Sequence, residues 1–261
     1  MMQPTPANFY KYRGLGQHTE AIFVRNELFF AAPVTFNDPF DSAFRIAVEG
    51  QDNQRVFESM AFGQIRKKMP DLTLHETVQA AQQVGAAIIE RKAEECREIS
   101  VQKLARDTTD KVGVLSLSEK SDDILMWSHY ADCHKGICLE FSTSQPSFLQ
   151  KAQPVDYCDE FPSLNLHDIV VNEVLRTTAQ WILTKARQWA YEKEWRVLDF
   201  ETGPGPKVFP PESLTGVVLG CRISDKDRER VSSWLQSRGY EVSLYQAKQV
   251  AGCFRLSIEP V

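Results

Sequence analysis

The sequence lacks most of the motifs that assign a function directly. No glycine-rich phosphate loop of the Rossmann or P-loop type is present, and no internal repeat appears. The 6 cysteines form no C-x-x-C pair, which favours small buried thiols over zinc clusters or a disulfide framework. No apolar run approaches the roughly 20 residues needed to cross a bilayer. These absences argue against a membrane-spanning chain and against a standard nucleotide-binding loop.

The chain also has no excess of positive charge. Its 30 Lys and Arg residues are outnumbered by 35 Asp and Glu residues, giving a formal net charge of −5. Such a balance argues against a general nucleic-acid-binding protein, although not against a local basic groove. The opening residues, MMQPTPANFYKYRG, lack the charged and apolar regions of a signal peptide. We therefore expect a cytoplasmic protein with no membrane partner.

The predicted elements indicate an α+β fold. Most predicted strands are short, and runs of strands are separate from runs of helices, which favours a mixed, mainly antiparallel and possibly split sheet. Residues 52–109 are rich in Ala, Gln, Glu, Lys and Arg, so they predict a helical insertion that Met69-Pro70-Asp71 divides in two. In its second helix one apolar stripe is expected to be buried, formed by Val78, Ala81, Val84, Ile88 and Ile89. We expect residues 1–261 to form a single domain around this insertion.

The segment from Gly113 to Phe141 contains most of the side chains suited to chemistry. An apolar strand carrying Ser116 and Ser118 is followed by Asp123, which can cap a short helix. The helix should end near Gly136, where a left-handed backbone is expected, and a second strand should follow.

Two further segments supply charged side chains. Phe9 to Arg13 predicts an amphipathic strand whose cations either face water or, at Arg13, grip an anion. In an extended segment Glu192, Glu194 and Arg196 would share one face, where two carboxylates repel each other unless a cation, ligand or metal lies between them. The candidate cations are Arg187, Arg196 and Arg13.

A proline-rich segment, Pro33 to Asp41, predicts a rigid loop. Phe36 and Phe40 are expected to anchor the loop in the core. Asp38 and Asp41 are interpreted first as turn-forming side chains and second as site carboxylates.

Several motifs resemble an uncharacterised bacterial domain-of-unknown-function family. They are YKYR at residues 10–13, FNDPFD at 36–41, MWSHYADCHKGICLEF at 126–141, YEKEWR at 191–196 and LTGVVLGC at 214–221. The resemblance extends over almost the whole chain but implies no activity, because that family has none established.

A weaker resemblance implies a mechanism. An arginine on a first strand, a Ser-x-Ser on a middle strand and a Glu-x-Glu on a late strand are similar to the pattern of the mono-ADP-ribosyltransferase superfamily, which binds NAD in a split sheet. By this resemblance Arg13 would hold the NAD phosphates, and Ser116 and Ser118 would position the nicotinamide ribose. Glu194 would stabilise an oxocarbenium-like transition state as the catalytic carboxylate, and Glu192 would orient the acceptor. Leu117 departs from the pattern, which has threonine there.

Aromatic residues of the predicted helix would border the same cleft. Trp127, His129 and Tyr130 are candidates for stacking on nicotinamide or for forming a polar wall. The alternative is that Trp127 and Tyr130 are core aromatics and His129 is a hydrogen-bonded structural histidine.

Two other functions compete with an NAD-dependent transferase or NAD glycohydrolase. A metal-dependent nuclease would bind Mg²⁺ through four carboxylates, those of Asp38, Asp41, Glu192 and Glu194. A non-enzymatic sensing or interaction module would instead bury a partner against Trp-rich patches. His129, Cys133 and His134 form an incomplete ligand set, so we predict no metal centre among them. The NAD hypothesis requires Arg13, Ser116 and Glu194 to line one cleft. The sequence predicts neither the acceptor nor the oligomeric state.

Overall fold

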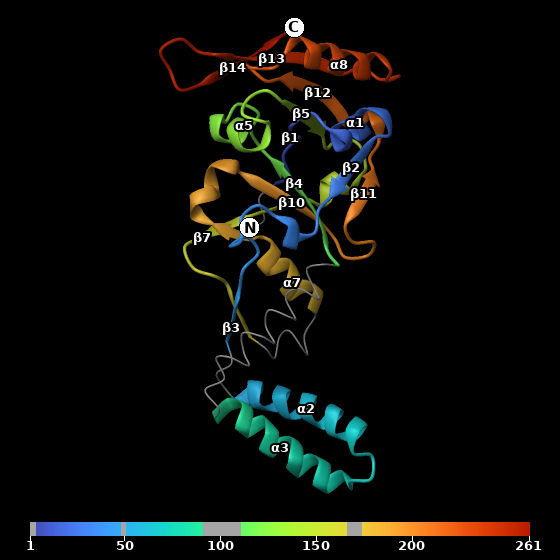
Figure 1. Ribbon diagram of the computed structural model, residues 1–261, viewed down its shortest axis with the longest axis vertical. Helices are drawn as coiled ribbons and strands as arrows, with labels where there is room; N and C mark the ends of the chain where they lie inside the picture. The colour runs from blue at the N-terminus through green and yellow to red at the C-terminus, as the bar shows by residue number, and fades with distance from the viewer. Residues whose placement is uncertain (1–3, 48–50, 91–110, 166–173) are drawn as a thin grey trace.

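An eight-stranded sheet organises the protein in the computed structural model, which describes residues 4–47, 51–90, 111–165 and 174–261 (Figure 1). β12 and β13 run parallel, and every other neighbouring pair in this sheet is antiparallel. The expected α+β class with a mixed, mainly antiparallel sheet is therefore confirmed. In spatial order the strands are β14 (Leu256–Pro260), β13 (Ser243–Gln249), β12 (Leu214–Leu219), β5 (Ile137–Ser142), β1 (Asn8–Arg13), β4 (Gly113–Ser118), β10 (Glu194–Asp199) and β6 (Gln153–Pro154).

Helices cover both faces of this sheet because its central strands are apolar on both sides. In β12, Val217 and Leu219 belong to the apolar cluster that includes α1 (Gln17–Val24) and α8 (Asp225–Gln236). Val218 points the other way, into the cluster that includes α5 (Ile124–Tyr130). The period of two along the strand thus distributes its side chains between two cores.

The sheet divides between β1 and β4. β1 pairs with β5 along its whole length, from Asn8 to Arg13, but it pairs with β4 only where Tyr10 faces Ser118. Beyond that point β4 meets the chain after β2 (Glu27–Phe30) instead, through a bridge between Ala31 and Val114. The two strands therefore diverge toward the end of β1, and side chains occupy the space between them.

Smaller pairs of strands surround this division. β2 pairs with β11 (Gly205–Val208) in antiparallel fashion. Parallel pairs join β3 (Arg45–Ala47) to β8 (Ser163–Asn165) and β7 (Asp156–Cys158) to β9 (Thr184–Ala186). The remaining described elements are α7 (Val174–Ile182) and the short 3₁₀ helices η1 (Pro33–Thr35), η2 (Phe148–Lys151), η3 (Arg187–Glu192) and η4 (Pro211–Ser213).

The predicted helical insertion is a hairpin of α2 (Gln51–Lys68) and α3 (Leu74–Glu90), drawn apart from the sheet in Figure 1. The predicted break at residues 69–71 is confirmed, and residues 91–109 of the predicted insertion lie outside the described residues. The expected apolar stripe is wrong at Val78 and Val84, which are 38% and 40% exposed. Ala81 is buried as expected, and Thr77 and Gly85, four residues to either side of it, are buried as well, because small residues let the two helices approach closely. The side chains of Ile88 and Ile89 lie outside the described residues.

α5 begins as the sequence predicts but ends differently. The side chain of Asp123 accepts hydrogen bonds from the backbone N–H groups of Leu125 and Met126, which caps the helix. After Tyr130, however, the left-handed backbone occurs at residues 132–134 and not at Gly136. Glycine is required at position 136 for a steric reason, since a Cβ there would lie 2.1 Å from the carbonyl oxygen of Arg13.

Replacing Gly136 by alanine should therefore destabilise the protein. The clash is with backbone, which cannot rotate away, so we expect a loss of about 1–3 kcal/mol in the free energy of unfolding. Urea denaturation measures this loss. Gly239→Ala is the matched control, because a Cβ at that exposed position would have no neighbour within 4 Å. Equal stability of the two variants would contradict the steric explanation.

Candidate functional site

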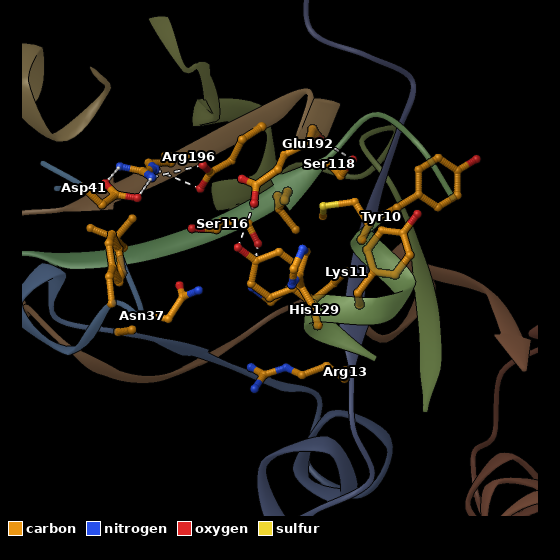
Figure 2. A pocket seen from close by; sticks show the side chains of 18 of the residues that line it. Tyr10, Lys11, Arg13, Asn37, Asp41, Ser116, Ser118, His129, Glu192 and Arg196 are labelled. Atoms are coloured by element: carbon orange, nitrogen blue, oxygen red, sulfur yellow. Dashed lines mark hydrogen bonds and ion pairs between the residues drawn. The ribbon is translucent and has the colours of Figure 1, made fainter. Parts of the chain in front are cut away.

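A pocket of about 440 Å³ lies where β1 and β4 diverge (Figure 2). Its volume is within the range of small-molecule and cofactor sites. The lining combines aromatic rings, cations, carboxylates and serine hydroxyls, which come from β1, β2, β4, α5, β9, η3, β10 and the loop before β3. It consists of Tyr10, Lys11, Tyr12, Arg13, Phe29, Ala31, Thr35, Phe36, Asn37, Asp41, Val114, Ser116, Leu117, Ser118, Met126, His129, Tyr130, Lys185, Glu192, Glu194 and Arg196.

Three adjacent strands bring the predicted site residues together. β1 carries Arg13, β4 carries Ser116, and β10 carries Glu194, and the three strands are consecutive in the sheet. The register places Glu194 opposite Ser118 on the neighbouring strand. The hydroxyl of Ser118 donates a hydrogen bond to the backbone carbonyl of Glu192 at 2.6 Å, so it fastens the segment that enters β10. The expected convergence on a single hollow is present.

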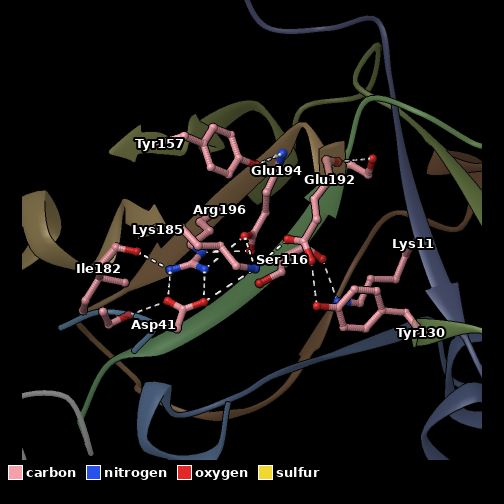
Figure 3. A network of polar contacts seen from close by, with 12 residues as sticks. Lys11, Asp41, Ser116, Tyr130, Tyr157, Ile182, Lys185, Glu192, Glu194 and Arg196 are labelled. Carbon is pink, nitrogen blue, oxygen red and sulfur yellow. Dashed lines mark hydrogen bonds and ion pairs between the residues drawn. The ribbon is translucent and has the colours of Figure 1, made fainter. Parts of the chain in front are cut away.

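Arg196 is the centre of a buried charge network (Figure 3). Its guanidinium donates to both carboxylate oxygens of Asp41, at 2.8 and 2.7 Å. It also donates to both oxygens of Glu194, at 2.8 and 3.0 Å. The side chain of Arg196 is only 1% exposed, so these contacts are made with almost no water. Bidentate pairing of this kind fixes the orientation of both carboxylates.

Lys185 of β9 connects this network to the second carboxylate. Its ammonium lies 2.5 Å from Glu192, 3.1 Å from Glu194 and 3.6 Å from the nearer oxygen of Asp41. The repulsion between the two glutamates is thus offset by a lysine that the sequence reasoning did not single out. Of the candidate cations, Arg196 does take part, whereas Arg187 pairs with Asp159 at the surface.

The two glutamates do not lie on one extended strand as expected. Glu192 ends η3, and Lys193 adopts a left-handed backbone with φ of 46° before β10 begins at Glu194. The turn nevertheless directs both carboxylates into the pocket, where Lys185 contacts them. An extended segment is wrong here because a left-handed residue reverses the local direction of the chain.

The two carboxylates differ in acidity. Burial raises the pKa of Glu194, but Arg196 and Lys185 outweigh burial and hold the pKa well below the usual range. For Glu192 burial is the dominant effect, and despite the opposing effect of Lys185 its pKa is raised. Glu194 therefore keeps its negative charge at any ordinary pH, and Glu192 is the carboxylate of the pair that protonates more readily.

The aromatic candidates divide between the pocket and the core. Tyr130 lines the pocket and donates its hydroxyl hydrogen to Glu192 at 2.7 Å. His129 also lines the pocket, with its ring near those of Tyr130, Trp189 and Tyr191. Trp127 does not, because it is fully buried under the sheet and its ring N–H is bonded to the carbonyl of Ser121. The prediction that Trp127 stacks on a ligand is therefore wrong.

The proline-rich loop contributes one carboxylate to the network. Asp38 accepts from the backbone N–H of Phe40, as expected of a turn-forming side chain. Asp41 is instead the buried partner of Arg196 and lines the pocket, so the turn-forming interpretation does not describe this residue. Phe36 packs near the guanidinium of Arg196, but Phe40 is 63% exposed and does not anchor the loop in the core.

The described residues contain no group of three or more His, Cys, Asp and Glu side chains arranged to hold a metal ion. Asp38, one of the four carboxylates proposed for Mg²⁺, is only partly buried and does not line the pocket. The other three carboxylates are already paired with Lys185 and Arg196. This arrangement does not favour the nuclease alternative.

Across the parts of the chain that the structure describes, every helix is too short or too polar to pass through a lipid bilayer. Comparisons with curated proteins and with solved structures found no match, and nothing in them links the chain to the ADP-ribosyltransferases. A family model does match residues 126–197, which hold the MWSHYADCHKGICLEF and YEKEWR motifs and the side chains of Tyr130, Lys185, Glu192, Glu194 and Arg196. This part of the chain is thus similar to the family described as Protein of unknown function (DUF2971).

Proposed function

We propose that the pocket binds NAD and that the protein transfers or hydrolyses its ADP-ribose group. The observation that supports this function is the convergence of Arg13, Ser116 and Glu194, from three consecutive strands, on one pocket. A cation at one side of that pocket suits the pyrophosphate of the dinucleotide. A permanently ionised carboxylate at the other side suits a sugar that gains positive charge.

The chemistry follows from the charges of the network. Three carboxylates, those of Asp41, Glu192 and Glu194, are balanced by two cations, Lys185 and Arg196, which leaves one negative charge in excess. When the bond between ribose and nicotinamide breaks, its electrons leave with nicotinamide and the ribose becomes oxocarbenium-like. A fixed negative charge in a site shielded from water lowers the energy of that transition state. Arg196 and Lys185 hold Glu194 in place for this role.

Replacing Glu194 by glutamine tests the proposal, since it removes the charge at nearly constant shape. We expect wild-type protein incubated with NAD to release nicotinamide, and Glu194→Gln to release it on the order of 10²-fold more slowly. Mass spectrometry of free nicotinamide measures both rates. Equal rates in the two proteins, or no release from either, would reject NAD cleavage.

Glu259→Gln is the matched control for this experiment. It makes the same chemical change on β14, where Glu259 pairs with Lys248 at the surface, and it should keep the wild-type rate. A circular dichroism spectrum and retained binding of ADP-ribose would show that Glu194→Gln is folded, so that its slower rate reflects chemistry.

A further inference from the structure

Lys11 and Arg13 are the two cations of the pocket that have no carboxylate partner. Within the described part of the chain neither forms an ion pair. Lys11 donates to the backbone carbonyl of Ser116 at 2.6 Å, across the space where β1 and β4 diverge. The Nε of Arg13 is buried and has no hydrogen-bond partner. Figure 2 shows the Arg13 side chain directed into the pocket, apart from the Asp41–Arg196 pair.

The two side chains also lie at the junction of two hollows. A second pocket, of about 460 Å³, adjoins the first and opens toward the start of α1. Both pockets are lined by Lys11, Tyr12, Arg13 and Tyr130. A ligand that extends from one hollow into the other must therefore pass the two cations.

Placing two unpaired cations close together is electrostatically unfavourable. They occupy positions i and i+2 of one strand, so they point to the same side of β1. Burial lowers the pKa of Lys11, and the neighbouring Arg13 lowers it further, to about 7. A dianion placed between them would offset both effects and restore the charge of the lysine.

We propose that Lys11 and Arg13 form a subsite for the pyrophosphate of the ligand, and that Lys11 takes up a proton when this dianion binds. The inference rests on the proposed function for its ligand class, which is a dinucleotide or ADP-ribose derivative. It adds Lys11 as a binding residue and makes the affinity depend on pH. Other titratable or charged groups from the surrounding elements also face this region: Tyr10 and Tyr12 of β1, His18 of α1, Asp41 before β3, His129 and Tyr130 of α5, Lys185 of β9, Glu192 of η3, and Glu194 and Arg196 of β10.

The sign of the pH dependence follows from Lys11. Below its pKa the lysine is charged before the ligand arrives, so binding needs no proton and is tight. Above that pKa binding must include proton uptake, and the affinity falls as the pH rises. Since the pyrophosphate of ADP-ribose is a diester that keeps its charge between pH 6 and 8.5, the change in affinity comes from the protein.

Isothermal titration calorimetry with ADP-ribose, which has no nicotinamide to lose, tests the subsite. We expect the Kd of the wild-type protein to rise about tenfold or more from pH 6.0 to pH 8.5. Titrations at pH 7.5 in two buffers of different ionisation enthalpy should show net proton uptake. Lys11→Arg, which stays charged, should bind equally at both pH values, and Lys11→Met should bind weakly at both.

Each outcome decides the inference. A wild-type Kd that is the same at both pH values, no binding at all, or a pH dependence that persists in Lys11→Arg would overturn it; the last result would assign the titration to a group other than Lys11. Proton-linked binding of ADP-ribose without nicotinamide release would reject NAD cleavage and keep the subsite. Nicotinamide release without proton-linked binding would keep NAD cleavage and reject the proton-linked subsite.

Discussion

Arg196→Met should lower the free energy of unfolding by about 3–5 kcal/mol, because it leaves the carboxylates of Asp41 and Glu194 buried without their main cation. Methionine is shorter than arginine but has a similar volume, so it fills most of the space. The loss therefore reports charge more than packing. The side chains of Asp41 and Glu194 are only 3% and 5% exposed, so water cannot replace the guanidinium. Chemical denaturation with urea at neutral pH measures the difference.

The control for this variant makes the same substitution in an exposed pair. Arg187 lies 2.9 Å from Asp159, within the 2.7–3.0 Å range of the contacts of Arg196 with its two carboxylates, but the two side chains are 60% and 67% exposed. Exposed ion pairs contribute about 0–1 kcal/mol, so Arg187→Met should be nearly neutral. If the two variants lost similar amounts of stability, the network around Arg196 would not be the buried, water-excluding structure described above.

The sequence predicted the parts of this site that depend on local pattern. Alternation of side chains placed Arg13 at the end of a strand, and the Asp123 cap set the start of α5. Residues that are close together in the sequence determine these features, so they can be predicted from a single sequence. The shared pocket of Arg13, Ser116 and Glu194 was expected from a resemblance, not from pattern.

Long-range pairing produced the features that the sequence reasoning missed. Asp41 and Arg196 are 155 residues apart, and nothing in their local segments indicates that they pair. Lys185 becomes a bridge between carboxylates only because β9 lies against β7 and because Lys193 turns the chain. Trp127 was wrongly placed in the pocket because helical spacing alone does not show which face of α5 packs on the sheet.

The second large effect is expected at Lys185, and it should depend on pH. In the wild type burial lowers the pKa of this lysine, but the facing Glu194 and Glu192 outweigh burial and raise it. A raised pKa means that the stabilisation from Lys185 is present below the unfolded value of 10.5 and is lost only above it. Lys185 is therefore charged, and its stabilisation is fully present, at both pH 5 and pH 8 in the wild-type protein.

Lys185→Met removes the charge that lies between the two glutamates. At pH 8 both carboxylates must be ionised and face each other, which should cost about 3–5 kcal/mol of unfolding free energy. At lower pH, protonation of Glu192 can remove the repulsion between the two carboxylates. The pKa of Glu192 is already raised above its ordinary value of 4.5, and loss of Lys185 would raise it further, so the folded variant takes up a proton there as the pH falls. The stabilisation that comes from protonated Glu192 is present near and below pH 4.5, and it is lost as the pH rises through the pKa of Glu192 in the folded variant. The destabilisation should consequently be smaller at pH 5 than at pH 8.

Urea denaturation of the wild type and the variant at pH 5 and pH 8 measures this difference, and Lys207→Met is its control. Lys207 lies 2.9 Å from Asp199, and hydrogen bonds from Thr202, Glu201 and Lys207 outweigh partial burial and lower the pKa of that carboxylate. Asp199 is thus ionised at both pH values, so the cost of removing Lys207 should be the same at each. A cost for Lys185→Met that is equally independent of pH would mean that Glu192 does not protonate when its cation is lost. The pair of glutamates would then be held apart by the backbone turn at Lys193 rather than by the charge of the lysine.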